Sequence, residues 1–145
     1  MKKITPFLWF NNNAEEAANF YVSIFKNSKI NNATPMMVSF VLDGQEFIGL
    51  NGGPQYAFTE AISMFVNCED QAEVDELWNA LLDGGQETQC GWLKDKFGLS
   101  WQIIPKALGE LMGDKDPIKA KRVLDAMLTM KKIEIDKLQA AYDAK

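Results

Sequence analysis

One pattern occurs twice in this chain of 145 residues, and the second copy follows the first at an offset of 57 residues. An apolar stripe with helical spacings of three and four recurs in order as Ala17, Phe20, Tyr21 and Ile24, then Val74, Leu77, Trp78 and Leu81. Each stripe follows a predicted helix cap, Asn13 with Glu16 and Asp70 with Glu73. A repeated stripe behind a repeated cap indicates a duplicated structural unit.

A β-hairpin is predicted after each stripe. In the first copy, Asp43-Gly44 separates the apolar runs Met37–Leu42 and Glu46–Leu50, and such a pair is a strong hairpin signal. In the second copy, Trp92-Leu93 and Ser100–Ile104 are the expected arms. Together with the strands predicted over Ile4–Phe10 and Ala61–Val66, and an indistinct second strand in each copy, each unit reads as β-α-β-β-β.

The predicted fold class is therefore α+β, with two tandem βαβββ modules that form one cleft and a helical extension at the C-terminus. We expect residues 1–105 to form the paired domain, with modules at about 1–54 and 60–105. Residues 106–145 are expected to pack as helices on this domain or on a dimer partner. Asp116-Pro117 supports that reading, because it is a good cap followed by proline at the first helical position.

The charge of the chain excludes one class of partner. The net charge is −5, and the first 105 residues carry six Lys/Arg against thirteen Asp/Glu. Such an acidic body is not expected to bind nucleic acid, whose affinity comes mainly from neutralised phosphates.

No run approaches eighteen apolar residues and no signal-length apolar segment opens the chain, so we expect no membrane association. The two cysteines are too few for a disulfide framework. We therefore predict reduced thiols and a cytoplasmic location.

Several longer segments carry a family resemblance. They are ITPFLWF, AEEAANFYVSIF, FVLDGQEFIGLNGGP, AISMFVNCEDQAEVDELW, CGWLKDKFGLSWQIIP and MLTMKKIEI. With these the chain resembles the PhnB-like family, often labelled 3-demethylubiquinone methyltransferase-like, within the vicinal oxygen chelate superfamily of glyoxalases, dioxygenases and bleomycin-resistance proteins. The resemblance implies an eight-stranded, incompletely closed sheet around a cleft, with the helices outside.

The resemblance also implies where a metal ion would bind. In metal-using members four strands each provide one His or Glu ligand, and the matching positions here are Thr5, Gly49, Ala61 and Gln102. None of these is a carboxylate or an imidazole, and the chain contains no histidine. A divalent ion needs several converging anionic or imidazole donors. We therefore expect no metal ion and no cofactor.

A small-molecule ligand is the predicted partner. Alternation along the strands places aromatic and amide side chains next to the four positions above, which suits a flat or apolar compound. The predicted ligand-binding residues are Phe7, Trp9, Phe47, Asn51, Ser63, Phe65, Trp92 and Gln102. The preferred function is a metal-independent protein that binds and sequesters such a compound. The alternative structural interpretation is that these rings fill the core and that the Gln102 amide is satisfied by backbone.

The alternative function is a lyase or isomerase of the glyoxalase superfamily. Cys90 is a weak candidate nucleophile, since a thiolate needs a nearby cation or helix N-terminus and the chain lacks histidine as a base. Asp43, Glu46 and Asp95 are carboxylates in or beside hairpin tips, where we expect them to be solvated turn residues. The βα turns contain no glycine, so methyl transfer with an adenosine cofactor is unsupported.

A homodimer is the predicted assembly. Modules of this kind leave open sheet edges that need covering. The predicted C-terminal helices also have spare apolar side chains such as Met127 and Met130.

Overall fold

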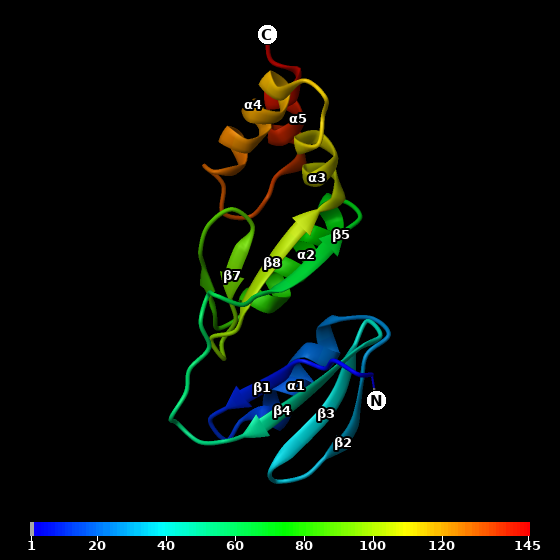
Figure 1. The fold of residues 1–145 in the computed structure, drawn as a ribbon, viewed down its shortest axis with the longest axis vertical. Helices are drawn as coiled ribbons and strands as arrows, with labels where there is room; N and C mark the ends of the chain where they lie inside the picture. Colours follow the sequence, from blue (N-terminus) through cyan, green and yellow to red (C-terminus); the bar gives the residue numbers. More distant parts are fainter. Residues whose placement is uncertain (1) are drawn as a thin grey trace. The chain divides into compact units, whose positions relative to one another are not determined.

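The computed structural model describes residues 2–145, and the chain divides into two compact units, Met1–Phe58 and Thr59–Lys145 (Figure 1). The first unit contains, in chain order, β1 (Phe7–Phe10), α1 (Ala14–Ile24), β2 (Lys29–Ala33), β3 (Met37–Leu42) and β4 (Gln45–Asn51). The second begins with β5 (Met64–Cys68), α2 (Gln71–Leu82), β6 (Gln86–Glu87), β7 (Trp92–Lys94) and β8 (Ser100–Pro105). The order βαβββ therefore occurs twice, as predicted.

The two sheets have the same topology. The strand order is β1-β4-β3-β2 in the first unit and β5-β8-β7-β6 in the second. In each sheet the first strand is parallel to the last strand of the unit, and the other neighbours are antiparallel. Helix α1 packs on β3 and β4, and α2 packs on β7 and β8 (Figure 1). Each unit is thus a helix on one face of a four-stranded mixed sheet.

The first hairpin forms at the predicted turn. Asp43 and Gly44 have φ angles of 48° and 81°, the left-handed pair of a two-residue hairpin turn. Strand β1 is shorter than predicted, because Pro6 has no N–H for a ladder and instead accepts a hydrogen bond from the Ile48 N–H at 3.0 Å. Strand β5 also starts late, at Met64, since the residues before it form a turn in which Ala61 N–H donates to the Thr59 hydroxyl.

The helix caps differ between the units. Asp70 caps α2 as predicted, accepting a hydrogen bond from the Glu73 N–H at 2.9 Å. Asn13 lies at the N-cap of α1, but its side chain caps nothing, so that part of the prediction is wrong. The Ala14 N–H donates instead to Asn51 Oδ1 at 2.9 Å, from the end of β4. In α2 all four predicted stripe residues are buried, whereas in α1 Phe20 and Ile24 are only half-buried.

The helical extension has its own apolar cluster. The extension consists of α3 (Lys106–Met112), α4 (Pro117–Met127) and α5 (Ile135–Asp143). Buried side chains from the end of β8 and from the extension form the cluster: Ile104, Leu108, Val123, Met130, Ile133 and Leu138. Met127 is partly buried against it, so the two methionines that motivated a dimer largely fill the extension's own core.

One side chain of α2 holds the extension to the second unit. The Gln71 amide donates to the Ile133 carbonyl at 2.9 Å and accepts from the Ile135 N–H at 2.7 Å. Both ends of this amide are therefore satisfied at the start of α5. Among the described residues, no helix is long and apolar enough to cross a membrane.

Candidate functional site

Three of the predicted residues lie side by side on the second sheet. Gln102 on β8 is paired with Phe65 on β5 and with Trp92 on β7. Directly paired residues of neighbouring strands project from the same face of a sheet. Phe65, Gln102 and Trp92 therefore form one row, which we call the aromatic–amide row. Because the neighbouring side chains Leu93 and Trp101 are buried towards α2, this row lies on the opposite face.

The aromatic–amide row is accessible and its amide is oriented. Phe65 is 61% exposed, while Gln102 and Trp92 are half-buried. The Gln102 amide nitrogen donates to the Ser63 hydroxyl at 2.9 Å, so it is held by a side chain and not by backbone as the alternative interpretation assumed. Four predicted residues of the second unit are thus adjacent to one another.

The predicted residues of the first unit fall on two different faces. Phe7 and Trp9 pair with Ile48 and Leu50, on the face opposite α1. Phe47 is only 7% exposed and stacks on Phe40, with ring centroids 5.4 Å apart, beneath α1. Phe47 therefore lies on the opposite face of the first sheet from Phe7 and Trp9, although all three were predicted to bind one ligand.

Asn51 has a structural role at the end of β4. Its amide oxygen caps α1 through the Ala14 N–H, and its amide nitrogen donates to the Pro35 carbonyl at 2.9 Å. The same face contains Gly49, where an added Cβ would lie 3.3 Å from the Ala14 Cβ. Asn51 is thus engaged by backbone at both ends of its amide, which leaves it little capacity to orient a ligand.

Trp9 is positioned by the loop that follows β4. Its indole N–H donates to the Gly53 carbonyl at 2.9 Å, and its ring packs edge-on against Tyr56 with centroids 4.9 Å apart. Gly52 lies so close to the indole that a Cβ there would collide with it. The Gly52-Gly53 pair therefore serves close packing of an aromatic ring.

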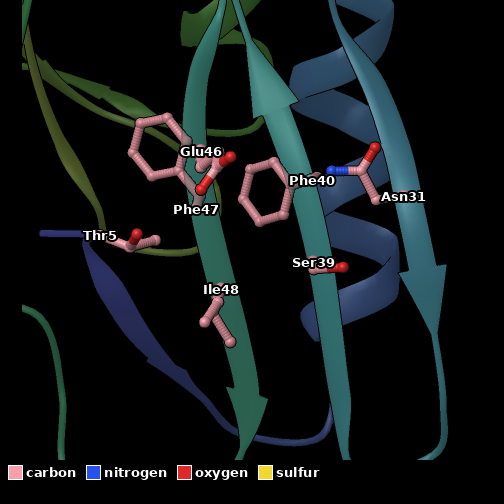
Figure 2. A pocket seen from close by; sticks show the side chains of 7 residues that line it. All are labelled: Thr5, Asn31, Ser39, Phe40, Glu46, Phe47 and Ile48. Atoms are coloured by element: carbon pink, nitrogen blue, oxygen red, sulfur yellow. The ribbon is translucent and has the colours of Figure 1, made fainter. Parts of the chain in front are cut away.

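A small depression lies on the first sheet. Its volume is about 180 Å³, and the residues that line it are Thr5, Asn31, Ser39, Phe40, Glu46, Phe47 and Ile48. Figure 2 shows Ser39, Glu46 and Ile48 along β3 and β4, with Asn31 on β2 and Thr5 before β1. Pockets for drug-sized ligands measure roughly 300–1,000 Å³. This depression suits at most a few atoms.

The three hairpin carboxylates differ from one another. Asp43 is exposed, as predicted for a turn residue, and Glu46 is half-buried and accepts from the Lys2 N–H at 2.9 Å. Asp95 is only 3% exposed, so the prediction that it is solvated is wrong. Its carboxylate accepts from the Phe97 and Leu99 N–H groups and from the Trp101 indole, which places it in the core beside α2.

The two cysteines are free thiols in different surroundings. Cys68 is fully buried at the end of β5, and burial raises the pKa of its thiol to about 12, with a smaller contribution from the negative charge of Glu73. Cys90 is half-buried, with a φ of 56° and its N–H bonded to the Met130 carbonyl at 2.8 Å. Cys68 is therefore an inert structural thiol.

Thiol titration of the native protein is expected to report one reactive cysteine. With an aromatic disulfide reagent at pH 8, Cys90 should react in the folded state, and Cys68 only after denaturation, because the thiolate is the reacting form. The Cys90→Ser variant should then show no reaction before unfolding. Rapid reaction of that variant in the folded state would contradict the assignment.

The donors present do not fit a divalent metal ion. Of the four positions matched to metal ligands, Thr5 precedes β1, Ala61 lies in the turn before β5, and Gly49 faces α1. Only Gln102 lies on the face opposite a helix, and it offers an amide. Across residues 2–145 no group of three or more His, Cys, Asp or Glu is placed to hold a metal ion. No step of a mechanism is therefore assigned to a metal.

Two residues on the face of the second sheet opposite α2 were not predicted from the sequence. Lys94 and Ser100 pair with each other across β7 and β8, two residues along from Trp92 and Gln102 respectively. Because side chains alternate between the two faces of a sheet, Lys94 lies on the same face as Trp92, and Ser100 on the same face as Gln102. No motif in the sequence singles them out, because a lysine and a serine in a hairpin are common exposed residues.

Comparison with known proteins identifies relatives. Residues 2–104 match the family model described as 3-demethylubiquinone-9 3-methyltransferase. The Bacillus cereus PhnB protein is 34% identical, with a TM-score of 0.65, and the match covers 72% of this chain and 99% of that chain. No curated protein matches this chain significantly.

Two further solved structures share the fold at lower identity. A Pseudomonas aeruginosa protein is 21% identical over 72% of this chain and 98% of its own, with a TM-score of 0.60. The fosfomycin resistance protein of Listeria monocytogenes, solved with Mn(II) and sulfate, is 15% identical over 70% of this chain and 88% of its own, with a TM-score of 0.53. The family resemblance inferred from the sequence motifs is thus confirmed, as is an α+β fold built from two βαβββ modules.

Proposed function

The chain belongs to the 3-demethylubiquinone-9 3-methyltransferase family, and on that premise we propose that it binds a small molecule without a metal ion. The binding surface is the face of the second sheet opposite α2. The observation that carries this proposal is the aromatic–amide row, in which two accessible rings flank one oriented amide.

The chemistry of this surface suits a flat ligand with a polar substituent. The Phe65 and Trp92 rings offer apolar contact area, and aromatic rings pack favourably in offset or edge-on arrangements. Between them, the Gln102 amide can accept as well as donate, and Ser63 can do the same. Phe7 and Trp9 provide a second aromatic surface on the first unit, on the face opposite α1.

Methyl transfer is not part of the proposal, although the family description names it. A cofactor that carries adenosine normally binds at a Gly-rich turn between a strand and a helix. Here the β1–α1 connection is Asn11–Asn13 and the β5–α2 connection is Glu69–Asp70, and neither contains glycine. The start of each helix is also occupied by a capping side chain of the protein itself.

The proposal includes an assembly and a location. We place the protein in the cytoplasm as a homodimer, in which residues 1–105 act as one paired domain. Exposed apolar side chains on one face of the first sheet, Phe7 and Met37, support association of two chains. Light scattering should give about twice the monomer mass of 16.3 kDa, and a strict monomer at micromolar concentration would contradict the dimer.

A thermal-shift screen with a library of metabolites and antibiotics tests the binding function. A ligand at a hundred times its Kd stabilises the folded protein by about 2.7 kcal/mol, which is readily measured. The shift should be reduced in Phe65→Ala and Gln102→Ala and kept in Ile118→Ala, which removes a similarly exposed apolar side chain from α4. A shift that survives both of the first two variants would contradict the site.

A further inference from the structure

A second row of side chains lies next to the aromatic–amide row. Lys94 on β7 pairs with Ser100 on β8, so both project from the face that carries Trp92 and Gln102. We call Lys94 and Ser100 the ammonium–hydroxyl row. The two rows together place a cation and a hydroxyl beside two aromatic rings and an amide.

The ammonium group of Lys94 already holds a carboxylate. Its partner is Glu60, which lies in the turn that precedes β5. The Glu60 side chain is 59% exposed. Among residues 2–145, the hydrogen bonds that close this turn run only from the Ala61 and Ile62 N–H groups to Thr59. Glu60 can therefore leave Lys94 without disturbing the sheet. The ion pair shows that this position on the sheet accommodates a carboxylate.

Ser100, the strand partner of Lys94, supplies a hydroxyl on the same face. The residue is 1% exposed, and its Oγ has no hydrogen-bond partner among residues 2–145. A buried hydroxyl without a partner is uncommon and calls for an explanation. A polar ligand atom that arrives when Glu60 leaves would accept the hydrogen bond that the folded chain does not provide.

We propose that the ligands of this site are small aromatic carboxylates. The ring lies against the aromatic–amide row, and the carboxylate replaces Glu60 at Lys94 and accepts a hydrogen bond from the Ser100 hydroxyl. Glu60 thus acts as an internal competitor of the ligand. This inference rests on the binding function proposed above and narrows it to one chemical class.

The charge state of Glu60 agrees with this role. The hydrogen bond from Lys94 holds the pKa of the Glu60 carboxyl below its usual range. At neutral pH Glu60 is therefore ionised and competes with a ligand carboxylate for the same cation. Removing this competing charge should strengthen the binding of acids and leave neutral compounds unaffected.

The test compares benzoate with its neutral isostere benzamide by NMR titration of the ¹⁵N-labelled protein. Benzoate should bind more tightly than benzamide, and Glu60→Gln should tighten benzoate about threefold to fivefold, the effect of one exposed ion pair. Glu69→Gln is the matched control, because it breaks the exposed pair with Lys106 in the same unit. This control should change neither affinity.

Two further variants separate the cation from the hydroxyl. Lys94→Gln should weaken benzoate about tenfold or more and leave benzamide unchanged, since charge-assisted hydrogen bonds are the strong ones. Ser100→Ala should weaken benzoate while the thermal midpoint of the free protein stays the same or rises. A purely structural serine would instead lower that midpoint when it is replaced.

The outcomes distinguish this inference from the function on which it rests. Equal affinity for benzoate and benzamide, or no response to Glu60→Gln, overturns the acid-binding role of Lys94. If neither probe binds and a library compound of another class depends on Phe65, the inference fails and the binding function stands. If no compound of any class depends on the aromatic–amide row, the binding function itself fails.

Discussion

Replacing Asp95 by asparagine is expected to lower the free energy of unfolding by about 2–3 kcal/mol. The Asp95 carboxylate accepts from the Phe97 and Leu99 N–H groups at 2.8 and 3.1 Å and from the Trp101 indole at 2.9 Å. An asparagine oxygen can keep the two backbone donors, but its amide nitrogen then faces the indole N–H. One hydrogen bond is lost, and two donors oppose each other in a buried site. Urea denaturation of the two proteins measures the difference.

Asp43→Asn is the matched control for Asp95→Asn. Asp43 occupies the tip of the other hairpin, where it is exposed and has a φ of 48° that asparagine tolerates well. Its replacement should change stability by less than about 0.5 kcal/mol. In a Trp101→Phe background, where the indole donor is absent, Asp95→Asn should cost less. Equal losses for Asp95→Asn and Asp43→Asn would contradict the buried role of Asp95.

Asp95 shows why the sequence alone could not identify a buried carboxylate. Its position in a hairpin tip is the ordinary place for a solvated aspartate. Its burial depends on Trp101, six residues further along, which turns towards α2 and offers its indole N–H. That contact follows from the register of β7 and β8, which composition and turn preference do not specify.

The repeated architecture was predictable because its signals are local. Two-residue turns and helical stripes depend on residues close in sequence, and both hairpins formed where expected. Strand ends were less predictable. Strand β1 begins only after Pro6, which has no N–H for the ladder. Near Ala61 a turn occupies the expected start of β5.

The faces of the first sheet were harder to assign than its strands. Along β4, Phe47 is buried, and Ile48 and Leu50 are half-buried, so both faces are apolar. Alternation then separates two faces without saying which one α1 covers. The packing of α1 settles this, with Phe47 stacked on Phe40 on the side where Tyr21 lies. On the second sheet an exposed Phe65 beside Gln102 reveals the opposite face.

Gly91→Ala is expected to lower the free energy of unfolding by about 3 kcal/mol. Gly91 has a φ of 86°, and a Cβ there would lie 2.7 Å from Ile104 Cδ1 and 3.0 Å from Ile133 Cγ1. Its N–H donates to the Lys131 carbonyl at 2.7 Å, and its carbonyl accepts from the Ile103 N–H at 2.8 Å, so the backbone cannot move away. The side chain would therefore separate the helical extension from β8.

Gly98→Ala separates this packing cost from the backbone cost. Gly98 has a nearly equal φ of 89°, but an added Cβ would meet nothing within 4 Å. Its replacement should cost only the left-handed strain of alanine, about 1–2 kcal/mol. The difference between the two variants, measured by urea denaturation, is the contribution of the contact between Gly91 and the extension. Equal losses would mean that Ile104 and Ile133 move aside at no cost, and would contradict the close packing at Gly91.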